Sequence, residues 1–328
     1  MKVLVLGGSG FVGRAVAVEA ARRGDDVTVF NRGHRDPVPG ATALVGDRLA
    51  PDGLAALCAG SWDVIVDTWS GDAEAVHRSA ALLTGRAEHY TYVSSRSVYR
   101  YGGGLPLTED APLCDPAEPG YAGDKLRGEQ AARTFGGPVL LGRAGLILGP
   151  HEDVGRLPWW LRRLHRGGPT LAPGPRDLPL QYIDARDLAA FLLDAAAGLL
   201  TGAYNLVSPP GHTTMGELLE VAAEVTGAHA ELCWLDPQTV LAAGIEPWTQ
   251  LPVWLPPGSD HAFMHNGDVS RARAAGLHNR PVRETVTDTW EWLTSLSGTP
   301  PQRTDRPPVG LDPAVEAKVL GEAPSRGW

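Results

Sequence analysis

Short apolar runs alternate with longer amphipathic segments along the first two-thirds of the chain. A run that is apolar at every position is typical of a parallel strand buried on both faces. We expect strands near 3–6, 27–30, 43–45, 63–67, 89–94 and 138–143. The first helix should run to about Arg23 and end at Gly24, a plausible helix cap. This alternation predicts an α/β fold, a doubly wound parallel sheet.

The first strand leads directly into a glycine-rich turn, G-G-S-G-F-V-G at 7–13, and the first helix follows it. Glycines in this context allow a tight turn and let backbone amides approach a pyrophosphate at the helix N-terminus. A tight turn without a ligand is the alternative. The context predicts a Rossmann domain whose loop residues contact a dinucleotide. Those residues are Gly7, Ser9, Gly10, Phe11, Val12 and Gly13.

The second strand ends at Asn31 and Arg32, where domains that bind NAD usually carry an acid for the ribose. The planar guanidinium of Arg32 could instead pair with a 2′-phosphate, which favours NADP while leaving NAD open. A solvated surface arginine is the alternative. Asp47 follows the third strand, where it could meet the adenine or cap a helix over 51–59.

Tyr121 and Lys125 stand four residues apart in Y-A-G-D-K, so a helix would place both on one face. Only two other lysines occur in the chain, Lys2 and Lys318, and the remaining basic residues are arginines. An ammonium beside a phenol favours the phenolate, which suits proton transfer. A solvated helix face is the alternative for this pair taken alone.

Further motifs follow in a fixed order along the chain. They are S-S-x-x-V-Y at 94–99, Y-x-x-x-K at 121–125, G-R-A-G-L-I-L-G-P at 142–150 and Q-Y-I-D-A-R-D-L-A at 181–189. Together with the glycine loop they make residues 1–200 resemble the extended or atypical short-chain dehydrogenases/reductases of the NAD-dependent epimerase/dehydratase superfamily. N-R-G at 31–33 resembles an atypical actinomycete subgroup usually labelled "reductase", whose relatives include chloroplast RNA-binding proteins.

The resemblance implies a role for each matching residue. Tyr121 matches the catalytic acid/base, Lys125 the lysine that holds the nicotinamide ribose, and Ser95 the hydrogen-bond donor to the reacting oxygen, with Ser97 as its competitor. Further expected cofactor contacts are Arg48, Thr68, Ala144 and Gly145. Arg96 stands with Ser97 where family dehydratases carry an Asp-Glu pair, which argues against a dehydratase.

The domain organisation follows the motifs. We expect a dinucleotide-binding domain at 1–150, rejoined by 180–197, a smaller substrate lobe at 151–179 and 198–296, and a Pro-rich linker with a short helix at 297–328. Ten tryptophans suggest an aromatic pocket for a ring, although core packing is the alternative for each. Candidate substrate residues are Trp69, Ser97, His151, Trp159, Trp160, Gln181, Trp248 and Trp254.

Charge and composition limit the classes of partner that the protein is expected to bind. A net charge of −9 and a pI near 5.6 disfavour nucleic acid and anionic membranes. Three scattered cysteines indicate reduced thiols, and no His/Asp/Glu set has metal spacing, so we expect no metal. No apolar run approaches the roughly 18 residues of a membrane span, and the chain enters strand one without a signal peptide. We expect a cytoplasmic protein with a small-molecule substrate; the resemblance also allows a homodimer.

These observations favour an NADPH-dependent reductase of a ketone, aldehyde or imine in a ring-containing metabolite of specialised metabolism. Two alternatives stay open. A nucleotide-sugar epimerase would retain NAD and need a basic diphosphate site, for which Arg156, Arg162 and Arg186 are candidates. A non-catalytic NADP-sensing protein would bind the cofactor without turnover.

Overall fold

The computed structural model describes residues 1–322, and their contacts divide the chain into two compact units. The first unit comprises Met1–Ile147, Tyr182–Ser208 and Gly267–Asn279. The second comprises the remaining described residues.

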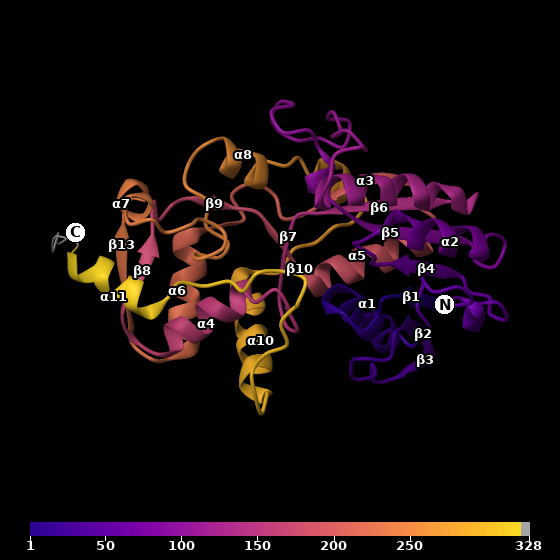
Figure 1. The fold of residues 1–328 in the computed structure, drawn as a ribbon, viewed down its shortest axis with the longest axis horizontal. Coiled ribbons are helices and arrows are strands. Elements are labelled where there is room, and N and C mark those ends of the chain that lie inside the picture. Colours follow the sequence, from indigo (N-terminus) through magenta and orange to yellow (C-terminus); the bar gives the residue numbers. More distant parts are fainter. Residues whose placement is uncertain (323–328) are drawn as a thin grey trace. The chain divides into compact units, whose positions relative to one another are not determined.

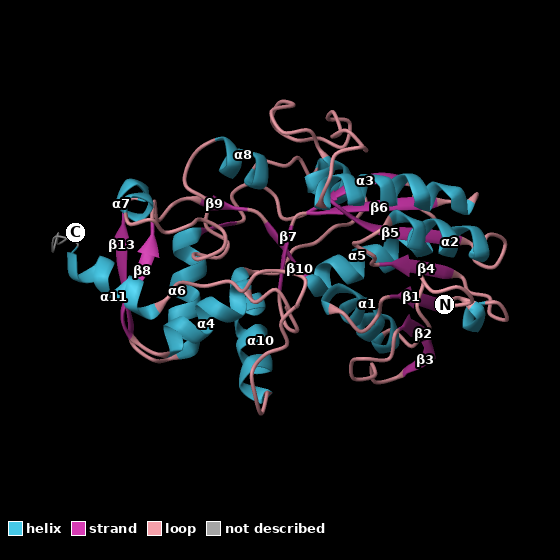
Figure 2. Ribbon diagram, in the orientation of Figure 1, coloured by secondary structure: helices cyan, strands magenta, loops and turns pink. Residues whose placement is uncertain are grey.

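Seven parallel strands form the central sheet of the first unit (Figures 1 and 2). They are β1 (Lys2–Leu6), β2 (Asp26–Asn31), β3 (Ala41–Val45), β4 (Val64–Asp67), β5 (His89–Ser95), β6 (Val139–Ala144) and β11 (Gly202–Leu206). Their spatial order is β11-β6-β5-β4-β1-β2-β3, so β1 lies between β2 and β4. The strand order reverses at β1, and doubly wound sheets bind ligands beyond the carboxyl ends of the strands at such a point. The predicted Rossmann architecture is confirmed.

Helices cover both faces of this sheet. One face packs against α1 (Phe11–Arg22) and α5 (Ala185–Ala197), and the other against α2 (Ala73–Leu83) and α3 (Tyr121–Ala132). The shorter elements of this unit are the 3-10 turns Ala55–Leu57, Arg96–Val98 and Arg133–Phe135, the helix α9 (Ser270–Ala274), and the strand β10 (Tyr182–Asp184). The strand β7 (Leu146–Leu148), which pairs with β10, crosses the boundary between the units.

Two expectations about the chain need correction. The predicted lobe segment 198–296 includes β11, but β11 pairs in parallel with β6 at the edge of the main sheet. Because β11 follows α5 directly, a crossover connection returns the chain to the sheet beside β6. The segment 51–59, considered as a helix, forms only the turn Ala55–Leu57.

The second unit combines a helical layer with small two-stranded sheets. Its elements are α4 (Arg156–His165), β8 (Gly168–Pro173), β9 (Pro179–Leu180), β12 (Thr213–Thr214), α6 (Met215–Thr226), β13 (Ala230–Leu235), α7 (Pro237–Ala242), α8 (Ser259–His265), α10 (Val282–Ser295) and α11 (Pro313–Glu322). Helices α4, α6 and α10 pack together, while β13 pairs in parallel with β8. Among residues 1–322, no helix has the length and apolar character needed to cross a membrane.

Glu152 caps the N-terminus of α4. The N-cap residue, Gly155, has no side chain to accept a hydrogen bond, and the Glu152 carboxylate accepts instead from the backbone N–H groups of Arg156 (2.8 Å) and Leu157 (3.1 Å). Glu152 is fully buried, and burial raises the pKa of its carboxyl from 4.5 to about 7.

This pKa shift predicts a pH-dependent stability. Between pH 4.5 and 7 the folded chain holds a proton on Glu152 that the unfolded chain has lost. The free energy of unfolding should therefore fall as the pH rises through this window, by about 3 kcal/mol from this group. Glu152→Gln should lack that fall. Urea unfolding of both proteins at pH 5 and pH 8 measures it, and identical pH dependence in the two would contradict the shift.

Candidate active site

The predicted catalytic residues lie at the carboxyl ends of the central strands and on the helix that follows. Ser95 is the last residue of β5, and Tyr121 begins α3 with Lys125 one turn later. The Lys125 Nζ atom donates to the carbonyls of Val93 (2.7 Å) and Trp69 (2.6 Å). Lys125 is only 3 % exposed, whereas Tyr121 is 40 % exposed. The structure thus fixes the ammonium beside β5 and leaves the phenol accessible.

Ser95 and Ser97 form one hydrogen-bonded pair. The Ser95 Oγ atom donates to Ser97 Oγ (3.2 Å) and accepts from the Ser97 backbone N–H (3.1 Å). Ala144 lies directly beside Ser95 in the sheet, and Gly145 follows it at the end of β6. The two serines therefore stay candidates for one hydrogen-bonding position, at the strand end where cofactor contacts by Ala144 and Gly145 are predicted.

A buried ion pair holds α3 against the sheet. Arg143 on β6 donates to both carboxylate oxygens of Glu129 on α3, at 2.9 Å each. Glu129 also accepts from the Ser94 hydroxyl on β5 at 2.7 Å. Because the Arg143–Glu129 pair connects β5, β6 and α3, it fixes the helix that carries Tyr121 relative to the strand that carries Ser95.

A second buried pair supports the Trp69 carbonyl that receives Lys125. Arg48 donates to both carboxylate oxygens of Asp67, at 2.7 and 2.6 Å. Asp67 also accepts from the Tyr90 hydroxyl (2.5 Å) and the Trp69 backbone N–H (3.0 Å). The Arg48 guanidinium lies 5.2 Å from the centre of the Trp69 ring. Arg48 was predicted to contact the cofactor, and here its charge pairs with Asp67.

Two glycines of the loop between β1 and α1, Gly13 and Gly10, differ in how much space surrounds them. A Cβ at Gly13 would lie 2.5 Å from the Gly7 carbonyl oxygen, so packing of α1 on the loop excludes any side chain there. A Cβ at Gly10 would meet only the Gly7 oxygen at 3.7 Å and an Arg35 nitrogen at 3.9 Å. Gly10 is therefore not required by packing within the protein, and it leaves an open surface at the N-terminus of α1.

The remaining predicted cofactor residues surround this loop. Phe11 and Val12 begin α1, which has no acidic residue in its first turn and no side-chain cap. Thr68 follows β4, and its hydroxyl donates to the Leu6 carbonyl at 3.0 Å. The Ser9 carbonyl accepts a hydrogen bond from Arg35 at 3.4 Å. A helix N-terminus without local acids suits an anionic ligand.

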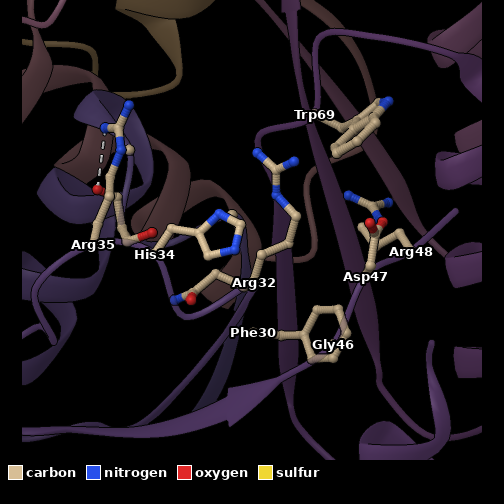
Figure 3. Close-up of a pocket in the computed structure, with 12 residues that line it drawn as sticks. Phe30, Arg32, His34, Arg35, Gly46, Asp47, Arg48 and Trp69 are labelled. Atoms are coloured by element: carbon tan, nitrogen blue, oxygen red, sulfur yellow. Dashed lines mark hydrogen bonds between the residues drawn. The ribbon is translucent and has the colours of Figure 1, made fainter. Parts of the chain in front are cut away.

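A pocket of about 210 Å³ opens at the ends of β1 and β2 (Figure 3). Its lining residues are Gly7, Ser9, Gly10, Phe30, Asn31, Arg32, His34, Arg35, Gly46, Asp47, Arg48 and Trp69. Arg32, His34 and Arg35 are exposed basic side chains on its rim, and the Asn31 side chain accepts from the Gly33 backbone N–H. Sequence reasoning singled out Arg32 but not His34 or Arg35. The run R-G-H-R at 32–35, which directly follows a buried strand, could have indicated that His34 and Arg35 lie at the pocket as well.

The candidate substrate residues have different surroundings in the two units. Trp160 and Trp254 are fully buried in the second unit, and their indole N–H groups donate to the carbonyls of Pro252 (2.7 Å) and Gly174 (3.0 Å). These contacts correspond to the core packing that the sequence also allowed. Gln181 is likewise fully buried.

Three further candidates make aromatic contacts within the second unit. Trp159 packs edge-on against the Trp160 ring, with 4.7 Å between the ring centres. Trp248 lies under the Arg156 guanidinium, and His151 packs against Trp292 with 5.1 Å between the rings. In the first unit, Trp69 lines the pocket and Ser97 pairs with Ser95.

The parallel sheet and the glycine loop between β1 and α1 define a Rossmann-like α/β protein. The model of the NAD dependent epimerase/dehydratase family matches residues 3–206, and the chain belongs to this family. "Chloroplast stem-loop binding protein of 41 kDa b" from Arabidopsis thaliana is 29% identical over 210 residues. That match covers 59% of this chain and 54% of the relative, so the chain spans about half the length of the curated relative it matches.

Solved structures share the fold at low sequence identity. The UDP-N-acetylglucosamine 4-epimerase of Methanobrevibacter ruminantium, in complex with UDP-N-acetylmuramic acid, superposes with a TM-score of 0.69 at 16% identity, covering 90% of this chain and 98% of that one. The Bordetella bronchiseptica enzyme WbmH, in complex with NAD+, gives 0.67 at 19% identity with the same coverage. At these identities the likeness establishes the fold.

Proposed function

We propose that this protein is an NADPH-dependent reductase of a ketone, aldehyde or imine. The observation that carries the proposal is the basic rim of the pocket at the end of β2. Arg32, His34 and Arg35 line it, and Asn31 stands where an NAD-binding domain usually carries an acid. A guanidinium at this position matches the doubly charged 2′-phosphate that distinguishes NADP from NAD.

The residues around the pocket fit a dinucleotide. Gly10 leaves room for a pyrophosphate at the N-terminus of α1, Arg32 would pair with the 2′-phosphate, and Asp47 lines the part assigned to adenine. Lys125, fixed on two strand-end carbonyls, would hold the nicotinamide ribose. When bound, the nicotinamide supplies hydride to the substrate.

The chain's own residues then handle the charge on the substrate oxygen or nitrogen. Ser95 donates a hydrogen bond to that atom, and Tyr121 delivers the proton. The Lys125 ammonium one turn away on α3 stabilises the phenolate that Tyr121 leaves behind. The exposure of Tyr121 supports this assignment because a proton donor must reach its substrate.

A nucleotide-sugar epimerase is the second candidate, favoured by the epimerase among the structural neighbours. The arginines suggested for its diphosphate site have protein partners. Arg186 donates to both carboxylate oxygens of Asp184 (2.9 and 2.8 Å), and the Arg156 guanidinium lies over the Trp248 ring. These contacts weigh against a diphosphate site at the two arginines. Arg162 is exposed and donates weakly to the Gly298 carbonyl (3.4 Å).

Transfer of deuterium from labelled NADPH separates the two functions. With NADPH deuterated at nicotinamide C4 and a panel of ketones, aldehydes and cyclic imines, we expect one deuterium in the product for each NADPH oxidised, detected by mass spectrometry. An epimerase would interconvert UDP-sugars without net NADPH consumption and would copurify with NAD. That second pattern would overturn the reductase assignment.

A further inference from the structure

The loop from β2 to β3 carries a second arginine whose surroundings differ from those of Arg32. The Arg35 Nη1 atom donates to the Ser9 carbonyl at 3.4 Å and lies 3.9 Å from the point where a Cβ on Gly10 would begin. Both neighbours belong to the glycine loop. The Arg35 guanidinium is therefore placed over this loop, beside the N-terminus of α1.

Arg32 and Arg35 project into different parts of the pocket. Figure 3 shows the Arg32 guanidinium on the side of His34 toward Asp47 and Trp69, which line the same pocket. Arg35 lies on the other side of His34, with its hydrogen bond to the glycine loop drawn as a dashed line. The two guanidinium groups therefore offer two positions at which a phosphate group could be bound.

The chemistry at the glycine loop suits a diphosphate. Helix α1 begins there with no acidic residue in its first turn and no side-chain cap, so its N-terminal dipole is not offset locally. Gly10 keeps the adjoining surface free of side-chain atoms. A guanidinium can pair with two phosphate oxygens at once, and it keeps its charge at all accessible pH values.

We propose that Arg35 binds the pyrophosphate of the dinucleotide, while Arg32 binds the 2′-phosphate. The β2–β3 loop would then close over the cofactor with one arginine on each phosphate site. This inference rests on the proposed dinucleotide function and adds a pyrophosphate ligand from outside the glycine motif. It also predicts that the two arginines affect different sets of ligands.

Four probes separate the two phosphates. NADPH carries both, NADH and ADP carry only the diphosphate, and 2′-AMP carries only the 2′-phosphate. In isothermal titration calorimetry, Arg35→Ala should weaken the binding of NADPH, NADH and ADP by about tenfold to a hundredfold. The affinity for 2′-AMP should stay within twofold of the wild-type value. Arg32→Ala should weaken NADPH and 2′-AMP by a similar factor and leave NADH and ADP unchanged.

Two controls make the experiment decisive. Arg133→Ala removes an exposed arginine that does not line the pocket, and it should change none of the four affinities. Arg35→Lys keeps the charge without the planar fork, so it should fall between wild type and Arg35→Ala. Arg35→Ala affecting only NADPH and 2′-AMP, or no probe at all, would overturn the inference. A wild-type protein that binds neither dinucleotide would instead refute the proposed function.

Discussion

Tyr121→Phe should lower kcat for the substrate found by deuterium transfer at least about 100-fold, while the affinity for NADPH stays within twofold of wild type. The substitution removes only the hydroxyl that delivers the proton. Tyr121 is 40 % exposed at the first turn of α3, and phenylalanine keeps its ring. Steady-state rates and calorimetric NADPH titrations measure the two quantities separately.

Lys125→Met and Tyr101→Phe complete this comparison. Lys125→Met should reduce both kcat and NADPH affinity, because it removes the proposed ribose ligand together with two hydrogen bonds to strand-end carbonyls. Tyr101 is an exposed tyrosine outside the pocket, and Tyr101→Phe should change neither quantity. Full turnover in Tyr121→Phe would exclude Tyr121 as the proton donor and would favour the non-catalytic binding protein.

Asp67→Asn should reduce the free energy of unfolding by about 3–5 kcal/mol. Asparagine can still accept from the Trp69 backbone N–H, but it leaves the Arg48 guanidinium buried without its counter-charge. Urea unfolding followed by far-ultraviolet circular dichroism measures the loss. NADPH affinity should fall as well, because the pair supports the Trp69 carbonyl that holds Lys125.

The dependence of the free energy of unfolding on pH at acidic pH should also change in Asp67→Asn. Burial alone would raise the pKa of Asp67, but the charge and hydrogen bonds of Arg48 lower it below the ordinary value of 3.8. The carboxylate therefore contributes stability above that pH, and this is lost as the pH falls through the lower folded pKa. Asp67→Asn should lose this dependence.

Asp305→Asn provides the matched control. The Asp305–Arg303 pair has the same 2.6 Å separation as the closest contact of Asp67 with Arg48, but Asp305 is 62% exposed. Its removal should change stability by no more than about 1 kcal/mol. If Asp67→Asn reduced the free energy of unfolding no more than Asp305→Asn does, the buried Arg48–Asp67 pair would contribute no more to stability than an exposed pair.

The sequence predicted the parts of the fold that depend on local pattern. The strand around residues 3–6 is a continuous apolar run buried on both faces, and residues 27–30 are apolar and buried except for the half-buried Thr28. The glycine loop lies between β1 and α1 as expected. The edge strand β11 was assigned to the wrong unit. Three of its five residues are only half-buried, so its pattern resembles that of a short strand in either unit.

The support of the site could not be predicted in the same way. Arg48 and Asp67 are 19 residues apart, and nothing in their local sequence indicates that they pair. Glu129 and Arg143 meet only because α3 packs across β5 and β6. Such partners depend on the assembled sheet, whereas the catalytic and glycine motifs depend on spacing along the chain.

The tryptophans illustrate the same limit for the substrate side. Trp69 lines the pocket at the end of β2, whereas Trp160 and Trp254 fill the core of the second unit with their N–H groups bonded to carbonyls. Composition identified a high tryptophan count, but it could not separate residues that line a site from residues that pack. Burial and hydrogen-bond partners make that distinction.

Titration of the wild-type protein with NADPH and NADH tests the central claim most directly. Energy transfer from tryptophan to the reduced nicotinamide reports binding, and Trp69 lies in the pocket wall. If Arg32 binds a 2′-phosphate, NADPH should bind at least about tenfold more tightly than NADH, a difference of about 1.4 kcal/mol. Equal affinities, or tighter binding of NADH, would contradict the NADPH-dependent reductase and favour an epimerase that retains NAD.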